Sequence, residues 1–222
     1  MAPLALRDRR LHANLPTFPV ETPSAHSTHH NPDLTMGVTD MPMILFGVAV
    51  VILVVTLTGA VWSVAVPGRR LWPPPGRGSW QYLLTWVGFY AVCAINVLLL
   101  LMDWDSWVFQ GPLRFIAGVP LVVLGGLLAL WGVVTVGWKN TTGLKGGFVS
   151  AGPYRFTRNP QYLGDIVFFV GVSVLANSVL LWTTHLLLSL CFVVTPLAEE
   201  QWLEEQYGDE YREYRRRVPR FL

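Results

Sequence analysis

The chain has 222 residues, of which 52% are hydrophobic and only 14% are charged, with a formal net charge of +2. A soluble domain usually carries about 25% charged residues, and the apolar residues here come in long runs, so the composition excludes an ordinary soluble domain and indicates an integral membrane protein. The small net charge gives no reason to expect a nucleic-acid partner.

Residues 1–40 differ from the rest of the chain. They contain five prolines and four of the five histidines, and no long apolar run. This composition predicts a disordered N-terminal tail, and no secretory signal is expected because an apolar core with a cleavage site is missing. A metal site at His26, His29 and His30 is not expected, since no cysteine lies near them. An organelle-targeting role for the three arginines near the N-terminus stays open.

Residues 41–138 contain three predicted transmembrane helices, at about 43–66, 80–102 and 112–137. Each is long enough to cross about 30 Å of hydrocarbon. Asn96 is a strongly polar residue in the interior of the second helix, so we expect it to hydrogen-bond a neighbouring helix.

Glycines recur every seven residues along the third predicted helix, at positions 118, 125 and 132. Small residues on one face let two helices approach closely. The spacing therefore predicts a packing face. The two cysteines, Cys93 and Cys191, lie within apolar runs, which does not favour a structural disulfide.

Two further apolar runs, at about 161–176 and 178–197, are separated only by Asn177 and Ser178. This predicts a tight helical hairpin whose first arm is short for a full crossing. His185 lies in the second arm. An ionisable residue inside a membrane is a functional candidate, but a neutral histidine bonded to a neighbouring helix fits equally well.

Positive charge predicts the orientation. Most lysines and arginines fall in the loop 67–79, the loop 138–160 and the C-terminal tail, whereas the turn 103–111 contains none. Five crossings place the three basic regions on one side, which the positive-inside rule assigns to the cytoplasm. The pattern as a whole predicts an all-α polytopic membrane protein with about five transmembrane helices, ending in a cytoplasmic amphipathic helix.

The most informative segment is residues 152–165, GPYRFTRNPQYLGD, which is polar and basic between apolar runs. Asparagine is a good N-cap and proline suits the first helical position, so Asn159 and Pro160 predict a helix start. Helix N-termini favour anions, and Arg155 and Arg158 add positive charge there. A basic loop that only anchors to lipid headgroups would have the same composition.

A second polar segment begins at Glu199 and Glu200. The residues Leu203, Tyr207, Tyr211, Tyr214 and Val218 follow it at helical spacing. Glu200 projects into this apolar stripe, whereas Gly208 could interrupt the helix. The two glutamates could bind a ligand, or they could pair with Arg155 or Arg158 and tie the tail to the loop.

These motifs are GPYRxxRNPxYLG, then EExxL, then YGxxYxxY. They resemble the isoprenylcysteine carboxyl methyltransferase and phospholipid methyltransferase family of integral membrane enzymes. The resemblance covers residues 40–222, and it is most specific in the last third.

The resemblance implies S-adenosylmethionine as the methyl donor and residues 139–222 as the cofactor-binding and catalytic region. It places Arg158 and Glu200 in catalysis. The residues implied to bind the cofactor are Asn159, Pro160, Tyr162, Leu163, Gly164, Glu199 and Glu200. The expected partners are a lipid-like substrate and membrane lipids, with no metal and no nucleic acid.

One residue departs from the family pattern. Carboxyl methyltransferases of this family have histidine where this chain has Asn159, and asparagine cannot titrate. We therefore expect methyl transfer to a carboxylate, which needs no base, with an amine or thiol as alternatives. Asp165, Glu200 and His185 are the candidate bases.

Two other functions remain open. The segment NPQYLGD also resembles the NADPH-binding segment of membrane sterol reductases. A non-catalytic scaffold whose basic tail gathers anionic lipid would bind no cofactor.

Overall fold

The computed structural model describes residues 40–108 and 111–222, and the regular structure in these ranges is entirely helical. The predictions for the N-terminal tail, including His26, His29 and His30, lie outside the described residues. The five long helices are α2 (Met41–Ala65), α3 (Trp80–Met102), α4 (Leu113–Val136), α6 (Pro160–Ala176) and α7 (Val179–Tyr207). The short helices are η1 (Pro67–Arg69), α5 (Trp138–Thr141), η2 (Gly152–Arg155) and α8 (Asp209–Arg217).

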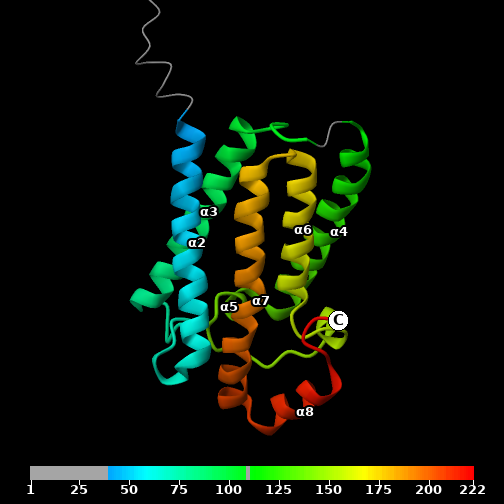
Figure 1. Cartoon of the computed structure of the whole chain (residues 1–222). Coiled ribbons are helices and arrows are strands. Elements are labelled where there is room, and N and C mark those ends of the chain that lie inside the picture. Colours follow the sequence, from blue (N-terminus) through cyan, green and yellow to red (C-terminus); the bar gives the residue numbers. More distant parts are fainter. Residues whose placement is uncertain (1–39, 109–110) are drawn as a thin grey trace, which may run out of the picture.

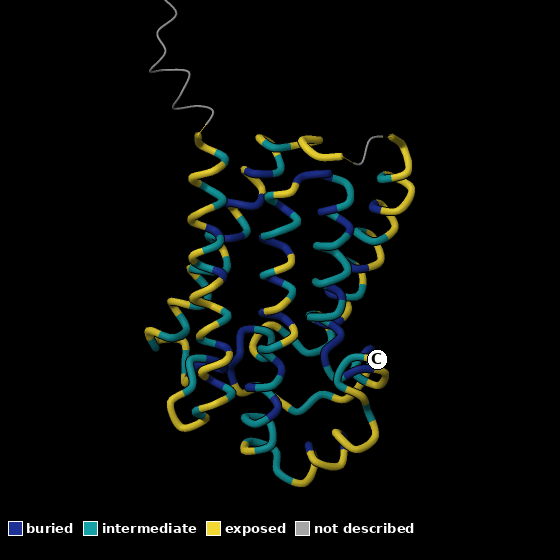
Figure 2. The backbone as a smooth tube through the Cα atoms, viewed as in Figure 1, coloured by how far each residue is buried: buried dark blue, intermediate teal, exposed yellow. Residues whose placement is uncertain are grey.

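The five long helices lie side by side in one bundle (Figure 1). By length and composition, α2, α3, α4 and α7 can cross a membrane, whereas α6 is a shorter apolar helix of 17 residues. At about 1.5 Å per residue, α6 spans only about 25 Å, as its predicted short length implied. The outer faces of the bundle are exposed along much of its length (Figure 2). Large apolar side chains dominate them, as expected for contact with lipid.

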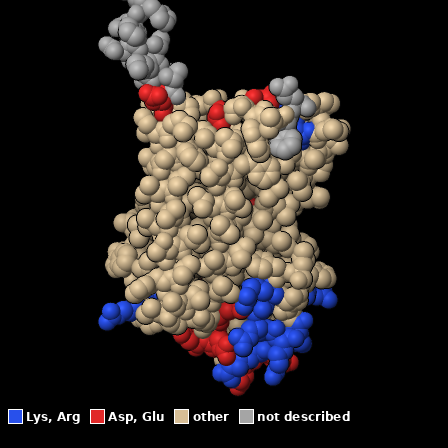
Figure 3. Space-filling model, viewed as in Figure 1, with Lys and Arg blue, Asp and Glu red and all other residues tan. Residues whose placement is uncertain are grey.

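Charged side chains gather at the ends of the bundle. Figure 3 shows a broad belt almost without charged side chains, with most of the visible lysine and arginine at the end that carries the C-terminus. This distribution supports the polytopic membrane fold that was predicted from the sequence.

Helices α6 and α7 form the predicted hairpin. Asn177 ends α6 in the left-handed conformation, with φ of 49°, which asparagine tolerates better than most residues. The Ser178 hydroxyl then caps α7 by accepting from the backbone N–H of Leu181 at 3.2 Å. The loop after α3 is bound to this turn, because Asp105 accepts from the Asn177 side chain at 2.7 Å and also pairs with Arg114.

The glycine face of α4 packs against α6. A Cβ atom built on Gly125 would lie 2.4 Å from the backbone nitrogen of Phe168, and one on Gly164 would lie 2.4 Å from the backbone nitrogen of Ala129. Gly118 similarly approaches Gly171, and Gly132 approaches Gln161. The prediction that the three glycines of α4 serve close packing is therefore confirmed. The close contact of Gly132 with Gln161 also fixes the position of the N-terminus of α6.

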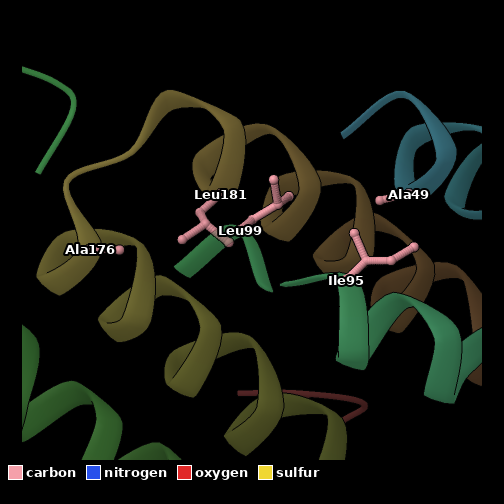
Figure 4. Close-up of a cluster of buried hydrophobic side chains, with 5 residues drawn as sticks. All are labelled: Ala49, Ile95, Leu99, Ala176 and Leu181. Atoms are coloured by element: carbon pink, nitrogen blue, oxygen red, sulfur yellow. The ribbon is translucent and has the colours of Figure 1, made fainter. Parts of the chain in front are cut away.

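The rest of the core joins α2, α3, α6 and α7. Five buried side chains form one cluster near the hairpin turn: Ala49, Ile95, Leu99, Ala176 and Leu181 (Figure 4). They come from four different helices, so this cluster holds the hairpin against α2 and α3.

The two buried polar residues predicted within the helices both have partners. Asn96 accepts from the Thr184 hydroxyl on α7 at 2.6 Å. His185 Nδ1 lies 2.7 Å from the Ser173 hydroxyl on α6. The second finding favours the interpretation of His185 as a histidine bonded to a neighbouring helix. Both cysteines are free, as expected.

The C-terminal helix differs from the sequence interpretation in one respect. Glu199 and Glu200 do not begin a separate helix but lie within α7, which continues to Tyr207. Gly208 then adopts φ of 57° and α8 begins at Asp209, so the predicted interruption at Gly208 is found.

Candidate active site

A cavity of about 110 Å³ lies at the basic end of the bundle. Its walls come from the end of α4, the loop after α5, the start of α6, the last turns of α7 and helix α8. Five predicted site residues line it: Arg158, Asn159, Tyr162, Glu199 and Glu200. The fold therefore brings the basic motif and the two glutamates, about 40 residues apart in sequence, into one site.

Two side chains donate hydrogen bonds to the same carboxylate oxygen of Glu199. Its Oε1 accepts from the Tyr162 hydroxyl at 2.5 Å and from Trp72 Nε1 at 2.6 Å. Trp72 belongs to the proline-rich loop after α2, so three distant segments converge on this carboxylate. Both bonds go to Oε1, and Glu199 is one of the residues that line the cavity.

Glu200 lies between two arginines. Arg220 binds it in a bidentate manner, with Nε 2.7 Å from Oε1 and Nη2 2.9 Å from Oε2. Arg158 Nη1 lies 3.2 Å from the same Oε1, and the side chains of both Arg158 and Glu200 are nearly buried. Of the two pairings expected from the sequence, Arg158 makes the contact, whereas Arg155 is exposed.

Asn159 occupies the N-cap position of α6, as predicted, but its side chain does not cap the helix. Its Nδ2 instead donates to the backbone oxygen of Arg220 at 2.9 Å. The Thr157 hydroxyl donates to the same oxygen at 3.0 Å, and the Arg158 N–H donates to the Pro219 oxygen at 2.9 Å. The amide is turned away from the helix because the C-terminal segment supplies a backbone acceptor beside it.

Aromatic rings form another wall of the cavity. Phe148 lies with its ring centre 5.3 Å from that of Tyr207 and 5.5 Å from that of Tyr214. Tyr214 donates to the backbone oxygen of Tyr154 at 2.7 Å. Tyr207, Tyr211 and Tyr214 therefore all face the cavity, as their helical spacing predicted. They do so although Gly208 separates α7 from α8.

The tyrosines outside the membrane segments stay protonated at neutral pH. Burial raises the pKa of Tyr214 to about 12. Burial also raises the pKa of Tyr154 and of Tyr211 well above the ordinary value. These hydroxyls are therefore hydrogen-bond donors rather than bases.

Three predicted cofactor residues are not among those that line this cavity: Pro160, Leu163 and Gly164. Gly164 lies instead against α4, where close packing explains the residue. Their roles toward a ligand stay predictions. Three residues that matter to the site were not singled out from the sequence: Trp72, Phe148 and Arg220. Within the described ranges, no three histidine, cysteine or acidic side chains gather as they would around a metal ion.

Comparison with known proteins supports the family that the motifs indicated. Residues 113–210 match the family model described as phospholipid methyltransferase. Over 116 residues the chain is 28% identical to protein-S-isoprenylcysteine O-methyltransferase B of Arabidopsis thaliana, covering 46% of this chain and 55% of the relative. Over 145 residues it is 27% identical to the nickel-cobalt-cadmium resistance protein NccN of Alcaligenes xylosoxydans xylosoxydans, covering 61% of this chain and 63% of the relative.

The alignments thus span between about half and two thirds of the length of these curated relatives. No solved structure matches the chain. The predicted resemblance to the isoprenylcysteine and phospholipid methyltransferase family is confirmed, and the family match includes all the motif residues from Gly152 to Tyr207.

Proposed function

We propose that this member of the isoprenylcysteine and phospholipid methyltransferase family uses S-adenosylmethionine to methylate a lipid-like or prenylated substrate at the cytoplasmic face of a membrane. The observation that carries the proposal is the cavity in which Arg158, Asn159, Tyr162 and the two glutamates meet. It lies where apolar helices end and basic residues begin, so a soluble cofactor and a membrane-bound substrate could both reach it.

The donor and acceptor groups of the cavity fit S-adenosylmethionine. Glu199 would accept from its amino group or ribose hydroxyls, and Arg158 would bind an anion. The aromatic wall around Phe148 suits an adenine ring. The volume of about 110 Å³ is below the roughly 300–1,000 Å³ of pockets that enclose small ligands, so binding requires the wall to open.

The loop between α5 and η2 forms a wall without regular structure, and it is held by hydrogen bonds from Asn140 to the Gly147 oxygen and from Tyr207 to the Gly146 oxygen, which an opening would break. Residues 144–150 form no helix, and the loop supplies Gly147, Phe148 and Val149 to the lining. Outward movement of this loop would enlarge the cavity without disturbing the packing of α4 against α6.

Catalysis in this proposal rests on positioning. Bound S-adenosylmethionine would supply an electrophilic methyl group. A carboxylate substrate is already ionised at neutral pH, so the protein needs to orient it and to exclude water rather than to remove a proton. The non-titrating Asn159 and the protonated tyrosines suit this chemistry, which makes a carboxylate the favoured acceptor over an amine or thiol.

The test is cofactor binding by the purified protein in detergent, measured by isothermal titration for the wild type, Glu199→Ala, Glu200→Ala and Asn159→Ala. Glu205→Ala is the matched control, because Glu205 lies on the same helix and pairs with Arg70 at 2.7 Å. We expect Glu199→Ala and Glu200→Ala to weaken binding by about tenfold or more, as the loss of a charge-assisted hydrogen bond does. Asn159→Ala should weaken binding by releasing the C-terminal segment from the site, and the control should bind normally.

Absence of binding by the wild type at millimolar S-adenosylmethionine would refute the proposal, and binding of NADPH instead would favour the reductase alternative. Transfer of a labelled methyl group into a lipid extract would then identify the acceptor. A base-stable product would exclude a methyl ester and hence the carboxylate.

A further inference from the structure

The last residues of the chain, from Val218 to Leu222, contact the site from outside the family match. The backbone oxygens of Pro219 and Arg220 accept three hydrogen bonds from the motif residues Thr157, Arg158 and Asn159. The segment is thus fixed against the motif through its backbone, independently of the Arg220 side chain.

The Arg220 guanidinium binds the Glu200 carboxylate through two of its nitrogens. Its Nε and Nη2 each bind a different carboxylate oxygen, at 2.7 Å and 2.9 Å, which is the bidentate geometry that orients a carboxylate best. Hydrogen bonding to Glu200 raises the pKa of Arg220 above its ordinary value. The side chain is 41% exposed, and it is not among the residues that line the cavity in the described structure.

Arg158 lies on the other side of the same carboxylate and does line the cavity. Two guanidinium groups around one carboxylate leave a single net positive charge. Arg158 Nε is buried and has no hydrogen-bond partner within the described residues. A buried unpaired donor of a charged group is costly, so an anionic ligand group that accepts from Arg158 would complete the arrangement.

We propose that Arg220 is a positioning residue, which fixes Glu200 and through it holds Arg158 ready for the carboxylate of the cofactor's amino-acid part. The inference rests on the proposed function, since it assigns the ligand of Arg158. In this arrangement Glu200 is a brace between two arginines rather than the acceptor of the cofactor's amino group.

The alternative arrangement makes the opposite prediction. In this alternative, Arg220 occupies the position on Glu200 that the cofactor's ammonium group would take. Removing the Arg220 side chain then frees the Glu200 carboxylate and strengthens cofactor binding. If the C-terminal segment has only a structural role, disturbing it weakens the binding of every ligand equally.

The experiment measures two probes by isothermal titration in detergent. S-adenosylhomocysteine carries the amino-acid carboxylate and ammonium, whereas 5′-methylthioadenosine has the same adenosine and thioether without either group. The variants are Arg220→Gln, Arg220→Lys and, as a control, Arg217→Gln, whose side chain is 69% exposed and lies 3.7 Å from Glu213. All three leave the backbone contacts of the segment in place.

We expect Arg220→Gln to weaken S-adenosylhomocysteine binding by about tenfold, the size of one charge-assisted hydrogen bond. Binding of 5′-methylthioadenosine should be unchanged, which also shows that the variant is folded. Arg220→Lys should restore part of the loss because it keeps the charge but not the bidentate geometry, and Arg217→Gln should match the wild type.

Equal weakening of both probes, no change in either, or tighter binding of S-adenosylhomocysteine by Arg220→Gln would each overturn the positioning role. If the wild type binds neither probe, the proposed function itself fails. If the wild type binds them but the variant pattern differs from that expected, the positioning role fails alone.

Discussion

A single methyl group added at Gly125 should destabilise the helix pair that carries the site. The new Cβ would lie 2.4 Å from the backbone nitrogen of Phe168 and 2.7 Å from the backbone oxygen of Gly164. Both are backbone atoms, so α6 as a whole must move away from α4. At the neighbouring Gly126, a Cβ would lie 3.6 Å from the Phe168 side chain, which is ordinary contact.

The comparison of Gly125→Ala with Gly126→Ala isolates the cost of this contact. Replacing glycine by alanine within a helix gains about 1 kcal/mol at either position, so this gain cancels in the difference. Overpacking costs about 1–3 kcal/mol. For a chain of this size, 1 kcal/mol shifts the melting temperature by about 2–4 °C. We therefore expect Gly125→Ala to melt about 2–12 °C below Gly126→Ala, by the same conversion.

Thermal unfolding in detergent, followed by circular dichroism or intrinsic fluorescence, measures the difference. Binding of S-adenosylmethionine should weaken in Gly125→Ala as well, because α6 carries Tyr162 into the cavity. A Gly125→Ala protein that melts at or above Gly126→Ala would show that α4 and α6 do not approach this closely.

Three further predictions test other contacts. Tyr162→Phe removes the hydroxyl that donates to Glu199 at 2.5 Å, so it should lower cofactor affinity by about tenfold in the same titration, and unchanged affinity would remove Tyr162 from the site. The pKa of Asp105 is lowered by its bonds to Asn177 and Arg114, so its stabilisation is present above the unfolded pKa of about 3.9 and is lost as pH falls through the lower folded pKa. Asp105→Asn should therefore melt below the wild type at pH 7, and the gap should begin to close near pH 4 and vanish below the lowered folded pKa, whereas a pH-independent gap would contradict this origin. In a double-mutant cycle, Asn96→Leu and Thr184→Val should show a coupling energy of about 0.6–1.7 kcal/mol, the range of interhelical hydrogen bonds in membranes, and additive effects would exclude the bond.

The parts of the site that the sequence predicts are those with a local signal. The proline after Asn159 places a helix start, the seven-residue glycine spacing places a packing face, and Glu200 follows from helical periodicity. Each of these signals depends on residues within a few helical turns of one another, so it can be recognised from the sequence alone.

The parts that the sequence does not predict depend on contacts between distant segments. Trp72 lies in an irregular proline-rich loop, yet it donates to Glu199, which is 127 residues away. Arg220 lies in a non-helical segment where no periodicity tells which way its side chain points. Even Asn159, whose position as helix cap is correct, has its side-chain partner determined by that same distant segment.

The departure of Asn159 from the family's histidine gains a physical meaning from these contacts. Its amide donates to the Arg220 oxygen, a role that needs a neutral donor and no titration. The nearby tyrosines are protonated, Glu200 lies between two arginines and Glu199 accepts from Trp72 and Tyr162. His185 is bonded to Ser173 between the helices of the hairpin. The groups of this site are therefore arranged to hold charges in place rather than to move a proton. In the proposed function, such a site would suit a nucleophile that arrives already ionised, and this is the physical reason to favour a carboxylate as the methyl acceptor.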